Sequence, residues 1–156
     1  MIYDFAQISF YHHYFEESTM QVIPYLNFNG QCEAAFKFYE ECLGGKIVTM
    51  MSYGDSPMAK DVPPAWHNIT MHASLAIGDT AVLMGSDRPP DGHEETKGIS
   101  VSIHMDDPAK GERTFNALAE GGKVQMPFTE TFWAAGFGML VDRFGIPWMV
   151  NCGRAA

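Results

Sequence analysis

Basic residues are scarce in this sequence: ten Lys and Arg stand against nineteen Asp and Glu, for a formal net charge of −9. Proteins that bind nucleic acid neutralise phosphates with a basic face, so the composition argues against a nucleic-acid partner. An anionic membrane surface is disfavoured for the same reason. No apolar run approaches the roughly 20 residues of a transmembrane helix, and we expect no membrane partner.

Cysteine is also rare, with only Cys32, Cys42 and Cys152 and no CxxC pair. An odd set without ligand spacing predicts neither a disulfide framework nor a structural zinc site. Residues 1–19 lack the basic start and clean apolar stretch of a signal peptide. Together these features favour a reducing compartment, and we expect a cytoplasmic protein.

Apolar side chains, by contrast, are plentiful: 46% of the 156 residues are hydrophobic and 13% are aromatic. A chain of this length buries about 70% of its unfolded surface, so it needs no covalent staple. Regular patterning begins only near residue 20. We therefore predict an N-terminal extension over 1–19 and a single domain over 20–156.

The first half of that domain alternates between strand and helix patterns. Gln21–Asn29 predicts a strand, and apolar residues at helical spacing predict a helix over Cys32–Leu43 that ends at a Gly-Gly pair. Three further strands are predicted over Lys46–Tyr53, Asn68–Ile77 and Thr80–Met84. The half-chain thus has the order β-α-β-β-β.

The same order occurs in the second half. Ile99–Met105 alternates as a strand, and Ala109–Glu120 predicts a helix that again ends at Gly-Gly. Strands are predicted over Lys123–Thr131, Gly138–Asp142 and Pro147–Asn151. The repeat indicates an internal duplication.

Each half alone cannot bury its sheet, so the two must pack together. We predict an α+β fold in which two paired βαβββ modules form a curved, cup-shaped mixed sheet with the helices outside. Module one spans about 20–86, a polar linker 87–97, and module two about 98–152. A sheet that wraps a cavity binds small molecules, so we expect a small-molecule ligand.

Three stretches carry a resemblance to a known family: ETFWAAGFGMLVDRFGIPWMVN at Glu130–Asn151, PYLNFNG at Pro24–Gly30, and FYEECLGG at Phe38–Gly45. The chain resembles the PhnB-like branch of the vicinal-oxygen-chelate (glyoxalase/bleomycin-resistance/dioxygenase) superfamily over about residues 20–152. The resemblance implies a glyoxalase-like pair of βαβββ modules and a homodimer. It also implies, for the catalytic members, a divalent metal held in the cup.

The positions that the resemblance assigns to metal ligands are unsuitable here. The first falls at Pro24, or at Ile23 with one residue inserted, the second at Ser100 and the third at Met149. Divalent metals in such sites take carboxylate or imidazole ligands, and none of these side chains supplies one. We therefore expect no metal and no cofactor, with a divalent metal on displaced ligands as the alternative.

Two polar strand faces contain histidine. His72 alternates with polar residues in NITMHAS, and His104 alternates with Ser100 and Ser102. A polar face on an apolar sheet lies in solvent, in a dimer contact or on a cavity wall. For His72 a hydrogen-bonded structural or dimer role is favoured over ligand contact, and metal ligation is the weakest of the three.

Aromatic and thioether groups supply the remaining candidates for ligand contact. Trp148, on the last strand, is assigned to the core, whereas flat faces in the FWAAGF loop suit stacking on a planar ligand. The candidate ligand-binding residues are Tyr25, His72, Ser102, His104, Phe132, Trp133, Phe137 and Met149.

Three functional hypotheses follow. The first is a small-molecule binding protein that holds a partly aromatic or apolar compound without the usual metal. The second is a metal-dependent lyase, isomerase or dioxygenase with displaced ligands, for which His72 and Glu130 are weak catalytic candidates. The third is a structural or partner-binding dimer. The sequence does not decide whether the chain is an enzyme.

Overall fold

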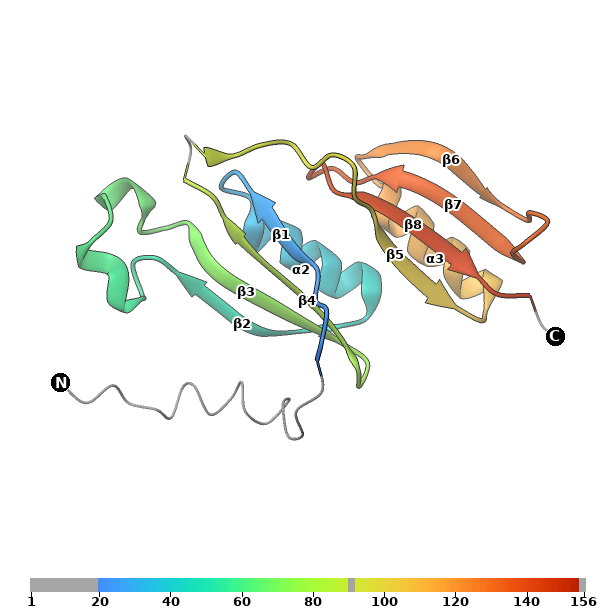
Figure 1. Ribbon diagram of the computed structural model, residues 1–156, viewed down its shortest axis with the longest axis horizontal. Coiled ribbons are helices and arrows are strands. Elements are labelled where there is room, and N and C mark those ends of the chain that lie inside the picture. The colour runs from blue at the N-terminus through green and yellow to red at the C-terminus, as the bar shows by residue number, and fades with distance from the viewer. Residues whose placement is uncertain (1–19, 90–91, 155–156) are drawn as a thin grey trace.

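A computed structural model describes residues 20–89 and 92–154 of the chain (Figure 1). Module one contains four strands and a helix in the predicted order: β1 (Tyr25–Phe28), α2 (Cys32–Leu43), β2 (Lys46–Ser52), β3 (Thr70–Ile77) and β4 (Ala81–Asp87). The segment between β2 and β3 contains two short 3-10 helices, η1 (Pro57–Lys60) and η2 (Pro64–Trp66). The predicted extension 1–19 lies outside the described residues.

Module two contains one helix and four strands in the same order. Its elements are β5 (Val101–Met105), α3 (Pro108–Ala119), β6 (Lys123–Thr129), β7 (Gly136–Val141) and β8 (Pro147–Cys152). The strand order is β1-β4-β3-β2 in one sheet and β5-β8-β7-β6 in the other. In each sheet the first and last strands of the module pair in parallel, and the other pairs are antiparallel.

Both helices lie on the same side of the two sheets, as Figure 1 shows. The modules stand side by side with β1 and β5 toward the middle of the molecule. This confirms the predicted α+β fold of two βαβββ modules. Among the described residues the strands form two separate four-stranded sheets rather than one closed sheet, so β1 and β5 are both edge strands.

The helix boundaries follow from short signals in the sequence. Gly44 ends α2 in the left-handed conformation at φ 65°, and its N–H donates to the Glu40 carbonyl. Asp107 caps α3, where its carboxylate accepts from Ala109 N at 2.9 Å. The buried face of α2 consists of Cys32, Ala35, Phe36 and Tyr39.

A buried carboxylate joins the two modules. Asp142, 3% exposed in the turn between β7 and β8, accepts at Oδ2 from the Tyr39 hydroxyl at 2.6 Å and from Trp148 Nε1 at 2.8 Å. Its Oδ1 accepts from the backbone N–H of Phe144 and of Ile146, at 2.8 and 3.0 Å. Because Tyr39 belongs to module one, this network ties α2 to the opposite sheet. Four donors satisfy the charge that burial would otherwise penalise.

A second buried carboxylate organises module one. Asp87, 2% exposed at the end of β4, accepts from Cys32 N at 3.0 Å and from Thr70 N at 2.8 Å. The first contact satisfies an N–H at the start of α2, where negative charge is also favoured by the helix dipole. The second fixes the start of β3. Asp87 therefore holds a helix and two strands in register.

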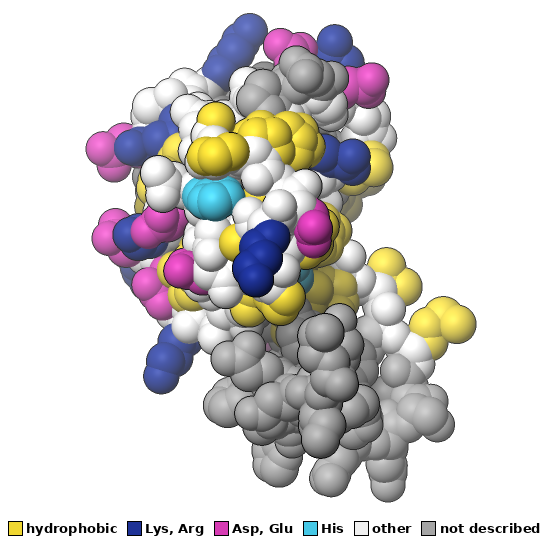
Figure 2. Space-filling model, turned by 90° about the vertical axis from the view of Figure 1, so that its left-hand side faces the viewer, with side chains coloured by type: hydrophobic (Ala, Val, Ile, Leu, Met, Phe, Trp, Pro, Cys, Tyr) yellow, Lys and Arg dark blue, Asp and Glu magenta, His cyan; other side chains and the backbone are white. Residues whose placement is uncertain are grey.

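Charged side chains of both signs are interspersed on the face of the molecule shown in Figure 2, with hydrophobic side chains between them. That face carries no continuous basic patch. In the part of the chain that the structure describes, no helix is long and apolar enough to cross a membrane.

The Asp142 network makes a testable prediction about stability. In Asp142→Asn, an amide NH₂ replaces one of two acceptor oxygens and faces a donor, so we expect the free energy of unfolding to fall by about 2–4 kcal/mol. Asp79→Asn, in the exposed β3–β4 turn, is the matched control and should change it by no more than about 0.5 kcal/mol. Urea denaturation followed by circular dichroism measures both. Equal effects of the two substitutions would contradict the assigned role of Asp142.

Candidate functional site

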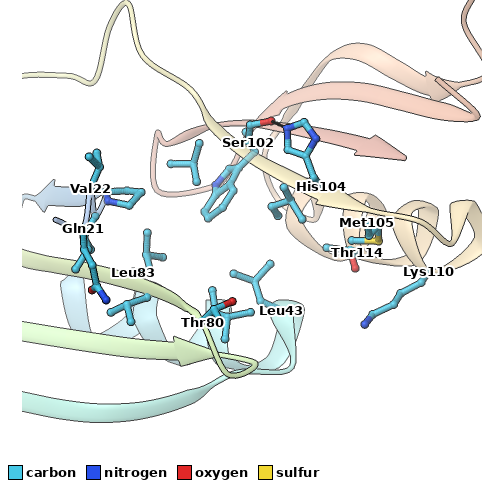
Figure 3. Close-up of a pocket in the computed structure, with 17 residues that line it drawn as sticks. Gln21, Val22, Leu43, Thr80, Leu83, Ser102, His104, Met105, Lys110 and Thr114 are labelled. Atoms are coloured by element: carbon cyan, nitrogen blue, oxygen red, sulfur yellow. Dashed lines mark hydrogen bonds between the residues drawn. The ribbon is translucent and has the colours of Figure 1, made fainter. Parts of the chain in front are cut away.

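A cleft of about 550 Å³ lies between the two modules (Figure 3). Module one contributes the segment before β1, the end of α2 and the β3–β4 hairpin, and module two contributes the free edge of β5 and one side of α3. Its wall is largely apolar, with Leu43, Leu83, Val101, Ile103 and Trp148 among the lining residues. A cleft of this size and character suits a small organic ligand.

Polar groups lie at the two ends of the module-two wall. Ser102 and His104 project from β5 at one end, and Lys110 and Thr114 lie on α3 at the other, as Figure 3 shows. A few polar groups on an apolar wall fix the orientation of a bound molecule rather than supply most of its affinity. The cleft therefore has the composition of a binding site with a defined orientation.

Ser102 and His104 belong to a hydrogen-bonded chain on β5 and β8. Asn151 Nδ2 lies 3.3 Å from His104 Nδ1, and Ser102 Oγ lies 2.9 Å from His104 Nε2. When the amide donates to Nδ1, the neutral ring carries its proton on Nε2 and donates it to Ser102 Oγ. In that arrangement the Ser102 hydroxyl accepts from the ring and keeps its own proton available to donate.

Six of the eight predicted ligand residues lie on module two. Met149 pairs with Ser102 in the β5–β8 ladder, and Asn151 pairs with both His104 and Phe137. Ring centroids are 5.4 Å apart for Trp133 and Phe137 and 4.7 Å apart for Phe132 and Trp133. The six residues that form this continuous band are Ser102, His104, Met149, Phe137, Trp133 and Phe132. Of the band, only Ser102 and His104 line the cleft.

The other two predicted ligand residues form a pair on module one. The Tyr25 hydroxyl lies 3.2 Å from His72 Nδ1, and the two rings are 5.9 Å apart and tilted by 30°. Burial lowers the pKa of the His72 imidazole from its ordinary value, which favours the neutral ring. Neither residue lines the cleft between the modules.

The donor groups present do not suit a divalent metal. Across residues 20–89 and 92–154, no three or more His, Cys, Asp or Glu side chains gather closely enough to hold one. At the assigned ligand positions, Ile23 and Pro24 line the cleft, Ser100 is exposed ahead of β5, and Met149 lies beside Ser102. Hydroxyl and thioether groups are poor ligands for the hard or borderline ions that such sites take.

The two weak catalytic candidates do not come together. His72 lies on β3 in module one, whereas Glu130 follows β6 in module two, and Figure 1 shows these strands in separate halves of the molecule. Glu130 is exposed and pairs with Arg154 Nη2 at 3.0 Å. A solvated carboxylate in an ion pair is poorly prepared to act as a general base.

Two groups of site residues were missed by reasoning from the sequence. Asn151 alternates with Met149 on β8, and that period-two pattern alone was sufficient to place it on the same face. Lys110, Thr114 and Leu43 carry no comparable signal: Lys110 and Thr114 line the cleft through the packing of α3 on its own sheet, and Leu43 reaches it from α2 of the other module.

Comparison with known proteins supports the family resemblance seen in the sequence. The profile described as Glyoxalase/Bleomycin resistance protein/Dioxygenase superfamily matches residues 22–150. Protein YjdN of Escherichia coli (strain K12) is 34% identical over 140 residues, which cover 85% of this chain and 95% of that protein.

Solved structures agree with this match. Protein PA1353 from Pseudomonas aeruginosa is 50% identical with a TM-score of 0.80, covering 88% of this chain and all 100% of that one. A Bacillus cereus protein described as a putative 3-demethylubiquinone-9 3-methyltransferase, PhnB protein, is 21% identical with a TM-score of 0.71, covering 86% of this chain and 100% of that one, and shows the shared fold. The chain therefore belongs to the glyoxalase/bleomycin resistance protein/dioxygenase superfamily.

Proposed function

We propose that this protein binds a small, partly aromatic or apolar molecule in the cleft between its modules, without a divalent metal. Sequestration of a drug-like compound is the sharper form of the proposal. The observation that carries it is a cleft of about 550 Å³ with an apolar wall built from both modules and a short polar chain at one end. Burying an apolar ligand there gains roughly 25 cal/mol per Å² of surface removed from water.

Orientation of the ligand is assigned to Ser102. In the tautomer in which His104 Nδ1 accepts from Asn151 and Nε2 donates to Ser102, the serine hydroxyl is left as a donor toward the ligand. The matching group on the ligand is a carbonyl, ether or carboxylate oxygen.

A metal-dependent lyase, isomerase or dioxygenase is the less supported alternative. It needs carboxylate or imidazole ligands converging on one point, and His72 and Glu130 lie in different modules. We therefore derive no catalytic step for either residue.

Ligand binding is tested with a matched pair of valine substitutions. The probe is 8-anilinonaphthalene-1-sulfonate, whose fluorescence rises on transfer to apolar surroundings. Val101→Trp fills the cleft wall and should weaken saturable binding by about tenfold or more. Val124→Trp, at a 44% exposed position on β6, should leave it unchanged.

Since Val101→Trp enlarges a partly buried residue, Thr80→Trp at the exposed rim of the same cleft is a second filling variant. Thermal unfolding establishes that each variant is folded. Loss of affinity in Val124→Trp equal to that in Val101→Trp and Thr80→Trp would reject the cleft as the binding site.

Metal content is tested independently of any ligand. Protein purified without chelators should contain no stoichiometric zinc, nickel, manganese or iron by elemental analysis, because within residues 20–89 and 92–154 the donors that such ions need do not converge. Addition of each ion should leave the melting temperature unchanged, since only an ion that binds the folded state raises it. One equivalent of any of these metals per chain would favour the metal-dependent alternative.

We also propose that the protein is a homodimer, with the aromatic loop before β7 at the interface. Phe132 is 88% exposed and stacks edge-on against Trp133 at 4.7 Å, in a turn closed by hydrogen bonds between Thr131 and Ala134. A large aromatic group held rigidly in water is a typical interface anchor.

Light scattering after size exclusion tests the dimer. The full chain should elute with twice the chain mass, and Phe132→Asp should shift it toward the monomer because a desolvated charge would then face the partner. Met58→Asp, at a 48% exposed position on η1, is the control and should remain dimeric. A monomeric wild-type protein, or an unaffected Phe132→Asp variant, would contradict this interface.

A further inference from the structure

A second hollow, separate from the cleft, lies at one end of the module-one sheet. It has a volume of about 470 Å³ and is lined by residues that include Tyr25, Asn27, Tyr53, Ser86, Asp87 and Arg88. Strands β1 and β4 run parallel, so their carboxyl ends meet here. The hollow therefore collects side chains from the ends of β1, β2 and β4.

The one carboxylate in this lining is already engaged. Asp87 is 2% exposed, and its two oxygens accept from Cys32 N and Thr70 N at 3.0 and 2.8 Å. Its negative charge is directed into the protein, toward the start of α2. The only acidic side chain in the lining therefore faces the protein interior. An anion in the hollow would not be opposed by it.

Arg88 supplies the positive charge, and it is held in place at both ends. Its backbone N donates to the Phe28 carbonyl at 2.8 Å, and its side-chain Nε donates to Asn27 Oδ1 at 3.1 Å. None of the ion pairs among the described residues includes Arg88. With Nε engaged, the Nη groups still offer donors in the planar fork that matches a carboxylate.

Two phenol rings border the same hollow, and each is braced from behind. Tyr25 is 47% exposed, with its hydroxyl 3.2 Å from His72 Nδ1. Tyr53 packs edge-on against Trp66 of η2, with ring centroids 6.3 Å apart. Rings whose orientation is fixed offer stacking surface at a low cost in conformational entropy.

We infer that this hollow binds a small aromatic carboxylate, with the carboxylate on the Arg88 guanidinium and the ring against Tyr25 and Tyr53. One guanidinium held by hydrogen bonds and two phenol rings of fixed orientation border the same hollow. The planar guanidinium recognises a planar anion, and the rings recognise a flat apolar body. The hollow and the cleft have no lining residue in common. The two proposals therefore stand or fall separately.

The test compares two isosteric probes, benzoate and benzamide, by titration calorimetry on the full chain. Benzoate should bind saturably and at least about tenfold more tightly than benzamide, because only benzoate presents a charge to Arg88. Arg88→Gln should abolish that preference. Tyr53→Leu should weaken both probes by a similar factor of about fivefold, since it removes stacking surface but no charge.

Arg113→Gln on α3 is the matched control: Arg113 is exposed, forms no ion pair among the described residues and does not line the hollow. It should bind both probes as the wild type does, and thermal unfolding should show every variant folded. Equal affinity for the two probes, no binding of either, an equal loss in Arg113→Gln and Arg88→Gln, or displacement of benzoate by equimolar inorganic phosphate would each overturn the inference. Blocking the cleft with Thr80→Trp should leave benzoate binding intact, which separates this result from the proposed function.

Discussion

The buried carboxylate of Asp142 is the contact on which the relation between the two modules depends. It receives Tyr39 from module one and Trp148 from module two on the same oxygen. Trp148 is also a wall of the cleft, so the hydrogen bond that joins the modules fixes part of the binding surface. A charge that four donors satisfy tolerates little displacement, because any lost donor leaves a desolvated oxygen. The contact that joins the modules therefore also holds Trp148 in its place beside the cleft.

The two buried aspartates stabilise different parts of the fold. Asp87 operates within module one, where it joins α2, β3 and β4, and Asp142 operates between modules. Both carboxylates accept hydrogen bonds from donors inside the protein, so neither offers its charge to a ligand. The polar groups that remain available at the two proposed sites are few, chiefly Ser102 at the cleft and Arg88 at the hollow. Because few polar side chains remain outside the internal hydrogen bonds, the sequence contains no short motif that identifies a reaction.

The fold was accessible from the sequence because its signals are local. The helix predicted over Cys32–Leu43 has those same bounds, since a Gly pair ends it and its apolar period is clear. The first strand is shorter than predicted: Gln21–Pro24 lies before β1 and lines the cleft instead. Side chains on one strand face, such as Ser102 and His104, were likewise predictable from alternation. Lys110 and Leu43 were not, because a contact between a helix and a distant strand, within a module or between modules, has no short-range pattern.

β5 pairs only with β8 among the described strands, so one side of its backbone faces the cleft. Peptide N–H and C=O groups on that side are available to a ligand whatever side chains β5 carries. Under the proposed function, the side chains of β5 would select the compound, and its main-chain groups would help to hold it. Under the proposed function, side-chain replacements at the wall would change which compound fits while the main-chain groups of β5 stayed in place. If the proposed function holds, such a cleft would diverge toward new compounds in small steps, because the main-chain groups do not depend on the side chains that change.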